Sequence, residues 1–540
     1  MDQRFDTDLV ISGAGPAGLL LAIELCLAGV TPVVLERLPA ISEIPRGNGL
    51  FGQIVPMLDF RGLLEPLRAQ ATYAGPVPGF AFGPVQLDFG GLGTSPLDVL
   101  AIPQRKLEQF LEQRLTELGG TVTRGHEITA LTPAEEAITL EVRGPDGGYQ
   151  LRTRFLAGCD GAHSLVRKQA GIGFPGFTSA QVSKMGRVRV PAGMIVSGTR
   201  EIDVPGFGRL QPMQTVTTPT GRYSIGPMAA LDADAPDDAY IVATWEDEPG
   251  AADAAMTSPA PTPAQHASAT HTQAELTLAE LQASLNRVLG AELPLSEPIW
   301  LSRVVGNSRQ ADRYVAGQIV LAGDAAHVFG LGGSLNSGLT DALNLGWKLA
   351  AEVSGHAPAG LLASYHTERH AAGQRTLLHA RAQHALSARG EAADALRELF
   401  TEVTKLPGVA RHLGQLIQGS DVRYEMPGSG GHPLAGRLAP DLRLITSDGS
   451  VRVAELMRAA RPVLVDFTPD GRVAMAAAAG SSHVSCLRAE LGTRPADALL
   501  IRPDGYVAWA SGPDAADPVR GVAEAMATWF GSITQDAAGT

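Results

Sequence analysis

A glycine-rich turn near the start of the chain places the strictest constraint on the fold. Gly13, Gly15 and Gly18 stand in the spacing GxGxxG. They separate a short apolar run, Asp8–Ser12, from a longer apolar segment, Pro16–Gly29. The short run predicts a buried strand, and the longer segment predicts a buried helix that ends at a glycine. A chain with this opening is expected to begin an α/β domain almost at its first residue.

A second buried strand is expected at Thr31–Glu36, so the chain opens with a strand–helix–strand unit. In such a unit Gly13 permits the sharp turn, Gly15 lets a pyrophosphate approach the backbone, and Gly18 allows close packing of helix on strand. The free N–H groups and partial positive charge of the helix N-terminus favour phosphate binding. Glu36 can accept hydrogen bonds from ribose hydroxyls. The unit predicts a dinucleotide site without choosing between FAD and NAD.

Two later segments favour FAD. Gln318–Ala322 is expected to be a buried strand, and it is followed by Asp324, a glycine-rich loop and a helix near residues 337–353. An aspartate at a strand end can bind the hydroxyls of a ribitol chain, and the N-terminus of the next helix can stabilise negative charge on a reduced flavin. A third motif, Asp160-Gly161, follows a strand-like stretch at Gln150–Gly158.

Together the three motifs resemble those of the group A flavoprotein monooxygenases, the FAD-dependent aromatic hydroxylases. Within that family the chain resembles the bacterial enzymes that tailor aromatic polyketides. Gly13–Gly18, Asp160-Gly161 and Gly323-Asp324 match the family's motifs in order and spacing, and the resemblance covers residues 5–530. It implies that the first motif and the acid after it bind the ADP part of FAD. It also links the second motif to FAD and NADPH binding, and the third to ribitol.

Two further positions match the family, and two segments depart from it. Arg46 matches an arginine that approaches the flavin, and Gln104 matches a glutamine on the ribitol side, although an ordinary loop arginine and helix-cap glutamine are the alternatives. The loop Phe329–Asn336 is shorter than the family's and lacks its proline beside the flavin ring. Gln53–Pro56 stands where the family often has Arg-Thr-x-Glu. Both departures lie at the expected boundary of flavin and substrate, so the reaction subtype stays open.

The expected site therefore consists of a cofactor-binding set and a substrate pocket. No side chain is expected as a catalytic residue, because the flavin would carry the chemistry, and no metal site is expected. The pocket candidates are apolar residues whose ordinary role is core packing: Phe51, Met213, Tyr223, Trp245 and Phe329. The cofactor-binding candidates are Gly13, Gly15, Pro16, Ala17, Gly18, Glu36, Arg37, Arg46, Gln104, Asp160, Asp324, Gly332, Gly333, Ser334, Leu335 and Asn336.

Four other polar residues have simpler interpretations. Arg167 fits a contact to phosphate or NADPH and equally an ordinary salt bridge at a helix start. His327 fits a structural hydrogen bond better than a flavin contact. His366 and His370 are spaced i,i+4, but the residue after His366 is not the glutamate of a zinc protease, so an ordinary helix face is expected.

The remaining segments predict further domains. Short alternating runs between residues 180 and 300 predict an antiparallel sheet, within which Ala251–Thr272 is expected to be a flexible surface insertion. Beyond a break at residues 426–433, a small α/β unit resembles the thioredoxin-like C-terminal domain of the polyketide subgroup, and it contains no CxxC. The expected fold class is α/β: a Rossmann-like FAD-binding domain (1–178 and 300–400), an inserted mixed β-sheet substrate-binding domain (179–299), a helical linker (401–433) and a thioredoxin-like domain (434–540).

Composition narrows the partners and the compartment. The formal net charge of the 540 residues is −13 and no long basic run occurs, which argues against nucleic acid as a partner. The three cysteines lie far apart, which argues against a disulfide scaffold or a zinc site and fits a reducing cytoplasm. No secretory signal and no apolar stretch of membrane-spanning length is evident. A cytoplasmic protein without a membrane partner is expected, either a monomer or a dimer.

The resemblance implies a function. It predicts an FAD- and NAD(P)H-dependent monooxygenase that uses O2 to hydroxylate a polycyclic aromatic polyketide-type substrate through a flavin C4a-hydroperoxide, in secondary-metabolite biosynthesis. With only one dinucleotide fingerprint in the chain, NAD(P)H is expected to bind transiently. Baeyer–Villiger insertion or oxidative ring rearrangement of the same substrate class is an alternative, because one fold holds several chemistries. A non-oxygenating flavin dehydrogenase or redox-sensing binding protein is an alternative of another class.

Overall fold

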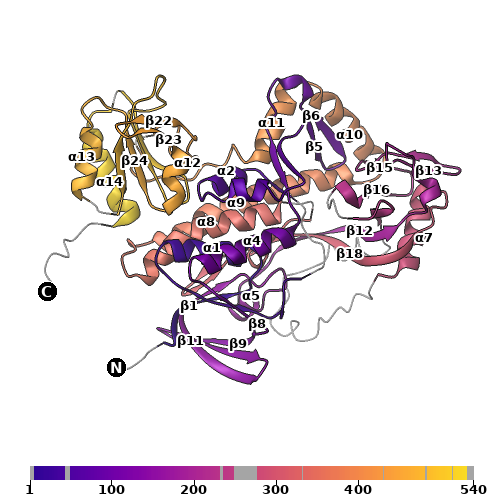
Figure 1. Cartoon of the computed structure of the whole chain (residues 1–540), viewed down its shortest axis with the longest axis horizontal. Helices are drawn as coiled ribbons and strands as arrows, with labels where there is room; N and C mark the ends of the chain where they lie inside the picture. Colours follow the sequence, from indigo (N-terminus) through magenta and orange to yellow (C-terminus); the bar gives the residue numbers. More distant parts are fainter. Residues whose placement is uncertain are drawn as a thin grey trace.

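The computed structural model arranges the chain as two sheet-based halves and a C-terminal domain, joined by long helices (Figure 1). No helix among the described residues is long and apolar enough to cross a membrane. The structure describes residues 5–42, 49–230, 235–247, 276–330, 333–429, 431–480, 483–513 and 515–531. The predicted insertion Ala251–Thr272 lies outside these residues.

A parallel sheet forms the centre of the first half. Its neighbours pair in the order β20, β11, β1, β2 and β8, and every pair in this series is parallel. Such strands are covered on both faces, which explains why their sequences are continuous apolar runs rather than alternating ones. The bounds are β1 (Thr7–Ser12), β2 (Val33–Glu36), β8 (Val122–Arg124), β11 (Gly147–Gly158) and β20 (Ile319–Leu321).

Antiparallel strands extend this sheet, and helices pack on it. The strands β10 (Ile138–Gly144) and β9 (Glu127–Pro133) continue from β11, and β19 (Val315–Ala316) pairs with β20. Helix α1 is apolar except for Glu24 and is buried against α8, where a Cβ at Gly346 would lie 2.4 Å from the Cβ of Glu24. The helices are α1 (Pro16–Leu27), α4 (Gln104–Glu117), α5 (Leu165–Gln169), α8 (Ser334–Val353) and α9 (Leu361–Ser387).

The second half is an antiparallel sheet with strand order β15, β16, β17, β12, β18 and β21. Every pairing in it is antiparallel, which confirms the prediction from the alternating runs, whereas the assignment of a mixed sheet to this domain is wrong. A tight turn at 218–221 joins β15 to β16, and such turns connect only antiparallel neighbours. Helix α7 (Leu278–Leu289) packs on one face. The strands are β12 (Gly176–Arg189), β15 (Thr215–Thr217), β16 (Arg222–Pro227), β17 (Ala239–Asp247), β18 (Ser296–Gln310) and β21 (His327–Val328).

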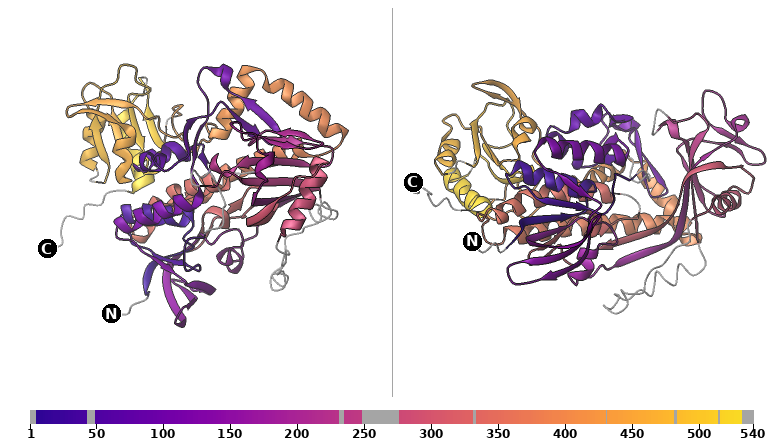
Figure 2. Two further views of the ribbon diagram at one scale, coloured as in Figure 1. Left: turned by 45° about the vertical axis from the view of Figure 1, so that its right-hand side comes forward. Right: turned by 60° about the horizontal axis from the view of Figure 1, so that its bottom comes forward.

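Two long helices, α8 and α9, connect the halves, and several small elements complete them. An aromatic cluster of Phe51, Phe80, Phe82 and Phe400 packs the β5–β6 hairpin against α10. Helices α8 and α9 run through the middle of the molecule, between the C-terminal domain and the antiparallel sheet (Figures 1 and 2). The elements are β3 (Leu50–Phe51), α2 (Ile54–Asp59), α3 (Leu64–Arg68), β4 (Tyr73–Pro76), β5 (Gly79–Phe82), β6 (Val85–Asp88), β7 (Asp98–Ala101), β13 (Ile202–Val204), β14 (Gly208–Leu210), α10 (Glu391–Thr404) and α11 (Pro407–Gln418).

The C-terminal domain is a four-stranded sheet with order β25, β24, β26 and β27. Val465 and Ile501 belong to a core formed mostly by the domain itself, which Phe60 of the first half joins, whereas Leu500 and Trp529 share a cluster with Trp347 of α8. The domain is therefore docked on the first half through an apolar face. Its elements are β22 (Arg443–Thr446), β23 (Gly449–Arg452), α12 (Val453–Leu456), β24 (Val463–Asp466), α13 (Arg472–Gly480), β25 (Ser485–Arg488), β26 (Ala498–Ile501), β27 (Val507–Ser511) and α14 (Pro518–Phe530).

A buried ion pair of the first half lies at this docking surface and hydrogen-bonds across it. Arg61 Nε lies 2.6 Å from Glu24 Oε1, and both side chains are 1% exposed. The same guanidinium donates to the carbonyl oxygens of Met457 and Pro503 in the C-terminal domain. Burial, the largest influence, raises the pKa of Glu24, and Arg61 opposes that shift.

We predict that Arg61→Met lowers the free energy of unfolding by about 3–5 kcal/mol, because it leaves a carboxylate buried without its partner. Arg68→Met is the matched control: Arg68 pairs with Glu65 on the surface, where a salt bridge contributes about 0–1 kcal/mol. Urea unfolding of both variants checks the prediction, and equal losses would contradict it.

Candidate active site

The three sequence motifs meet at one edge of the parallel sheet. Strands β1, β11 and β20 are adjacent, and their carboxyl ends lead into Gly13, Cys159 and Gly323. The N–H of Cys159 donates to Ser12 O at 2.8 Å, and Ala322 N donates to Gly158 O at 3.0 Å. Segments some 300 residues apart in the sequence thus lie side by side at the edge where open α/β sheets bind ligands.

The glycines of the first motif have different roles. Gly13 has φ +102°, and a Cβ there would lie 2.5 Å from the carbonyl oxygen of Cys159. A Cβ at Gly18 would lie 2.0 Å from Gly13 O. A Cβ at Gly15, which caps α1 just before Pro16, would meet no protein atom within 4 Å. The fold requires glycine at the first and third positions, and a ligand close to the backbone would require it at the second.

Glu36 lies beside this turn, as the spacing predicts. One carboxylate oxygen accepts from Ala14 N at 2.8 Å, and the other accepts from Leu38 N at 2.9 Å. Each oxygen retains a second lone pair that a ribose hydroxyl can use. The side chain of Arg37 is exposed next to it.

Asp160 provides the observation that best fits a bound cofactor. Its Oδ2 accepts hydrogen bonds from the N–H groups of Leu165 and Val166 at 2.7 and 3.1 Å. Its Oδ1 is buried and has no hydrogen-bond partner among the described residues. Buried polar atoms are normally satisfied, so a donor such as a hydroxyl of the cofactor fits this position.

Arg167 connects the second motif to the third. Its guanidinium donates to the carbonyl oxygens of Ala325 and Ala162 at 2.9 and 2.8 Å, and it lies 3.7 Å from the ring centre of Phe174. Burial lowers its pKa to about 10. Arg167 therefore ties the loops of the second and third motifs together through backbone carbonyls, and its contact with phosphate or NADPH stays a prediction.

The third motif is a close junction of β20 with α1 and α8. A Cβ at Gly323 (φ +63°) would lie 3.0 Å from the Cβ of Ala17, and one at Gly338 would lie 2.9 Å from the Cα of Gly323. The side chain of Asp324 is exposed at this junction. It is therefore accessible to a ligand placed between the N-termini of α1 and α8.

Helix α8 begins at Ser334, three residues before the predicted start, and Gly333 caps it with φ +95°. Ser334 Oγ accepts from Phe329 N at 2.8 Å, and Asn336 Oδ1 accepts from Phe51 N at 2.9 Å. These bonds hold the pocket candidates Phe329 and Phe51 beside the first turn of α8. Leu335 belongs to the same turn. Free N–H groups of a first turn can bind an anionic ligand.

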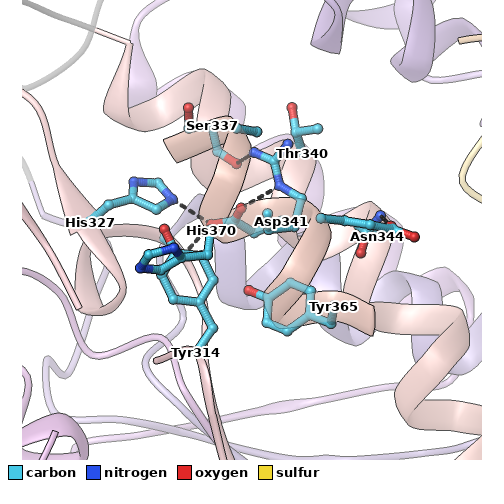
Figure 3. A network of polar contacts seen from close by, with 12 residues as sticks. Tyr314, His327, Ser337, Thr340, Asp341, Asn344, Tyr365 and His370 are labelled. Carbon is cyan, nitrogen blue, oxygen red and sulfur yellow. Dashed lines mark hydrogen bonds and ion pairs between the residues drawn. The ribbon is translucent and has the colours of Figure 1, made fainter. Parts of the chain in front are cut away.

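Asp341, which the sequence analysis did not single out, connects α8 to the residues that follow β20 and to α9 (Figure 3). Its buried carboxylate accepts from His327 Nε2 at 2.6 Å, Gly323 N at 3.1 Å and Arg369 Nε at 2.7 Å. Burial alone would raise the pKa of Asp341, but His327 and Arg369 lower it below its usual value. The structural hydrogen bond predicted for His327 is confirmed.

Other candidates lie elsewhere or outside the described residues. Gln104 is the first residue of α4, and its amide donates to Glu108 at 2.8 Å. Its contact with the cofactor stays a prediction. Arg46 and Gly332 are not among the described residues. No cluster of three or more His, Cys, Asp or Glu that could hold a metal ion occurs in the described part of the chain.

The five pocket candidates lie in three places. Phe51 contacts Phe80 at 5.2 Å between ring centres, and Phe329 stacks on His327 at 5.0 Å. Tyr223 is 2% exposed and belongs to the apolar core on the α7 side of the antiparallel sheet.

Neighbouring residues on β16 and β17 point to the opposite face of that sheet. Trp245 packs against Arg222, whose guanidinium is 5.5 Å from its ring centre and donates to Ser387 on α9. Met213 packs over Gly226, where a Cβ would lie 2.1 Å from its sulfur. Because side chains alternate along a strand, Tyr223 cannot share a pocket with Trp245.

Comparison with known families identifies this architecture. A family model described as "FAD binding domain" matches residues 6–380, and one described as "Aromatic-ring hydroxylase, C-terminal" matches residues 432–532. The chain belongs to the FAD-dependent aromatic-ring hydroxylases. It is thus an FAD-dependent oxidoreductase, and the predictions of FAD and of this family are confirmed. When bound, FAD supplies the redox chemistry of the family, the acceptance of hydride from NAD(P)H and the activation of dioxygen.

Relatives match this chain over nearly its whole length. The 12-dehydrotetracycline 5-monooxygenase/anhydrotetracycline 6-monooxygenase of Streptomyces rimosus is 36% identical over 97% of this chain and 99% of its own. A dialkyldecalin synthase of Streptomyces rugosporus is also 36% identical, over 97% of this chain and 98% of its own. The solved structure of OxyS anhydrotetracycline hydroxylase from Streptomyces rimosus has a TM-score of 0.82, with 34% identity over 97% of this chain and 99% of that chain.

We predict that Gly15→Ala weakens FAD binding by about 10-fold to 100-fold, as expected when a Cβ costs about 1–3 kcal/mol in the space of a tightly packed ligand. The apoprotein should lose less than about 1 kcal/mol of stability, the scale of an altered N-cap, because the Cβ meets no protein atom within 4 Å.

Gly91→Ala is the matched control, since Gly91 also has open space and an ordinary φ, and it lies on the surface. Flavin fluorescence titration and thermal unfolding check both variants. An unchanged FAD affinity in Gly15→Ala would show that the pyrophosphate does not approach this turn.

Proposed function

We propose that the protein inserts one oxygen atom from O2 into a polycyclic aromatic polyketide-type substrate, with NAD(P)H as a transient reductant. The observation that carries the proposal is the convergence of the three motifs around Asp160, whose buried Oδ1 lacks a partner among the described residues. The names of the Streptomyces rimosus relatives supply the substrate class by analogy. A role in secondary metabolism and a cytoplasmic location belong to the same proposal.

The residues around the site would bind, orient and shield. The turn at Gly15 and the N-terminus of α1 would bind the pyrophosphate, Glu36 the ribose, and Asp160 and Asp324 hydroxyls of the cofactor. The N–H groups at the first turn of α8 would stabilise negative charge at the ring edge, as preorganised donors do.

The substrate is proposed to lie between the first turn of α8 and the antiparallel sheet. Phe51 and Phe329, whose backbone N–H groups donate hydrogen bonds to that turn, would provide one apolar wall. Trp245 and Arg222 lie on the face of the antiparallel sheet where Arg222 donates a hydrogen bond to Ser387 of α9. They would provide the other wall. An enclosure of this kind, apolar on the side of Phe51 and Phe329, excludes water from the reacting atoms.

A non-oxygenating reaction is the second candidate. The dialkyldecalin synthase is as similar to this chain as the tetracycline monooxygenase is. The shortened loop at Phe329–Asn336 also departs from the family pattern at the expected flavin edge. Hydroxylation and Baeyer–Villiger insertion both add one oxygen atom, whereas cyclisation adds none.

We predict that the purified holoprotein consumes NAD(P)H and O2 in equal amounts when it is given a polycyclic phenol such as anhydrotetracycline. The product should carry one oxygen atom from isotopically labelled dioxygen, as mass spectrometry would show, and NMR would then distinguish a phenol from a lactone. Conversion of a substrate to an isomer without O2 uptake would overturn the proposed oxygenation and favour the cyclase-like alternative. A protein that retains no FAD would overturn both.

A further inference from the structure

One buried turn of the C-terminal domain packs against α8 and α9. The turn, Arg502–Tyr506, joins β26 to β27, and the side chains of Arg502, Asp504 and Tyr506 are 0–1% exposed. A Cβ at Gly505 (φ +87°) would lie 2.5 Å from the ring of Phe60 in the first half. The turn is therefore closely packed against another part of the chain.

Balanced charges fix this turn to α8 and α9. Arg502 donates two hydrogen bonds to the carboxylate of Glu368 on α9, at 2.6 and 2.8 Å. Lys348 of α8 donates to the same carboxylate at 2.8 Å, and Asn344 donates to Asp504 at 2.9 Å. Burial would raise the pKa of Glu368, but Arg502 and Lys348 lower it to about 2. The turn is held as a charged, hydrogen-bonded unit.

The next residue on α9 continues the contact toward the candidate site. Arg369 donates to Asp341 at 2.7 Å and to the carbonyl oxygen of Ser337 at 3.2 Å, and both acceptors belong to the first part of α8 (Figure 3). It also donates to the hydroxyl of Tyr424 at 3.0 Å. Tyr424 stacks on Tyr506 of the C-terminal turn, with 4.2 Å between ring centres.

A second route from the same tyrosine reaches the same helix turn. Tyr506 donates its hydroxyl hydrogen to Gln53 Oε1 at 2.6 Å. Gln53 follows Phe51 by two residues, and Phe51 N donates to Asn336 Oδ1 at 2.9 Å. The contacts thus form a closed ring that runs from α8 through Phe51, Gln53 and Tyr506, then back through Tyr424 and Arg369.

We propose that Tyr506 is a positioning residue: through Gln53 it holds Phe51, and with it the first turn of α8, in the geometry that the flavin and substrate require. The C-terminal domain would then contribute to the chemistry from outside the pocket. The inference rests on the proposed place of the flavin ring beside Ser334–Asn336. It assigns a task to a domain in which the sequence shows no CxxC.

Tyr506→Phe tests the inference, because it removes only the hydroxyl and keeps the ring on Tyr424. In the apoprotein, amide hydrogen exchange in residues 50–54 and 334–338 should quicken about fivefold to tenfold, the factor by which one lost hydrogen bond shifts a local opening. In the holoprotein, the flavin absorption spectrum and reduction potential should shift, and a larger share of NAD(P)H oxidation should yield hydrogen peroxide instead of product.

Two controls separate positioning from stability. Tyr240→Phe removes a similar buried hydroxyl, bonded to Arg200 O at 3.1 Å in the antiparallel sheet. Val465→Ala destabilises the C-terminal domain in its own core. Both variants should leave amide exchange in residues 50–54 and 334–338, the flavin spectrum and the reduction potential near their wild-type values. Gln53→Met removes the acceptor from the other side, and its effects should not add to those of Tyr506→Phe.

Three results would overturn the inference. The first is unchanged exchange in Tyr506→Phe and in Gln53→Met. The second is an equal flavin shift in Val465→Ala, which would assign the effect to domain stability. The third is faster exchange with an unchanged flavin spectrum and potential, which would place the flavin away from this turn. Failure of the proposed function itself would instead appear in the wild-type protein, as absent FAD or absent oxygen insertion.

Discussion

The geometry of the candidate site depends on the buried carboxylate of Asp341. It accepts hydrogen bonds from the backbone of Gly323, from His327 and from Arg369, so it ties the end of β20, the short strand after it and α9 to one turn of α8. A buried carboxylate without such donors would cost several kcal/mol. Helix α8 therefore cannot shift along its axis without breaking these bonds, and the distance between Asp324 and the helix start is fixed.

The local parts of the site could be predicted from the sequence, and the long-range parts could not. Gly13 and Gly18 are determined by contacts within one strand–turn–helix unit, so their spacing alone indicates their role. Asp341 and Arg369 acquire theirs from partners on other elements. The available signal was the aspartate in the first half of α8, a helix whose other acidic residue, Glu352, lies at its end, and an arginine between two histidines on α9.

The same distinction explains the errors in the second half of the molecule. Alternating runs correctly indicated antiparallel strands at β16 and β17, but the full set of pairings depends on tertiary structure, and the assignment of a mixed sheet to the whole domain was wrong. Tyr223 was chosen as an aromatic residue in a strand, yet the face that it occupies depends on register. The sequence places Trp245 and Tyr223 in similar surroundings, whereas the pleat places them on opposite faces.

The charge cluster of Arg502, Glu368, Lys348 and Asp504 has a consequence for how the chain is made. During synthesis, α8 and α9 leave the ribosome long before the turn that covers the Lys348–Glu368 ion pair exists. Until then this pair faces water, and burying it without the donors of the turn would be costly even though its charges balance. The face of the two helices that carries this pair is therefore buried only when the C-terminal turn arrives. Although the cofactor motifs lie in the first two thirds of the sequence, the last elements to be synthesised would decide when the cofactor can be bound.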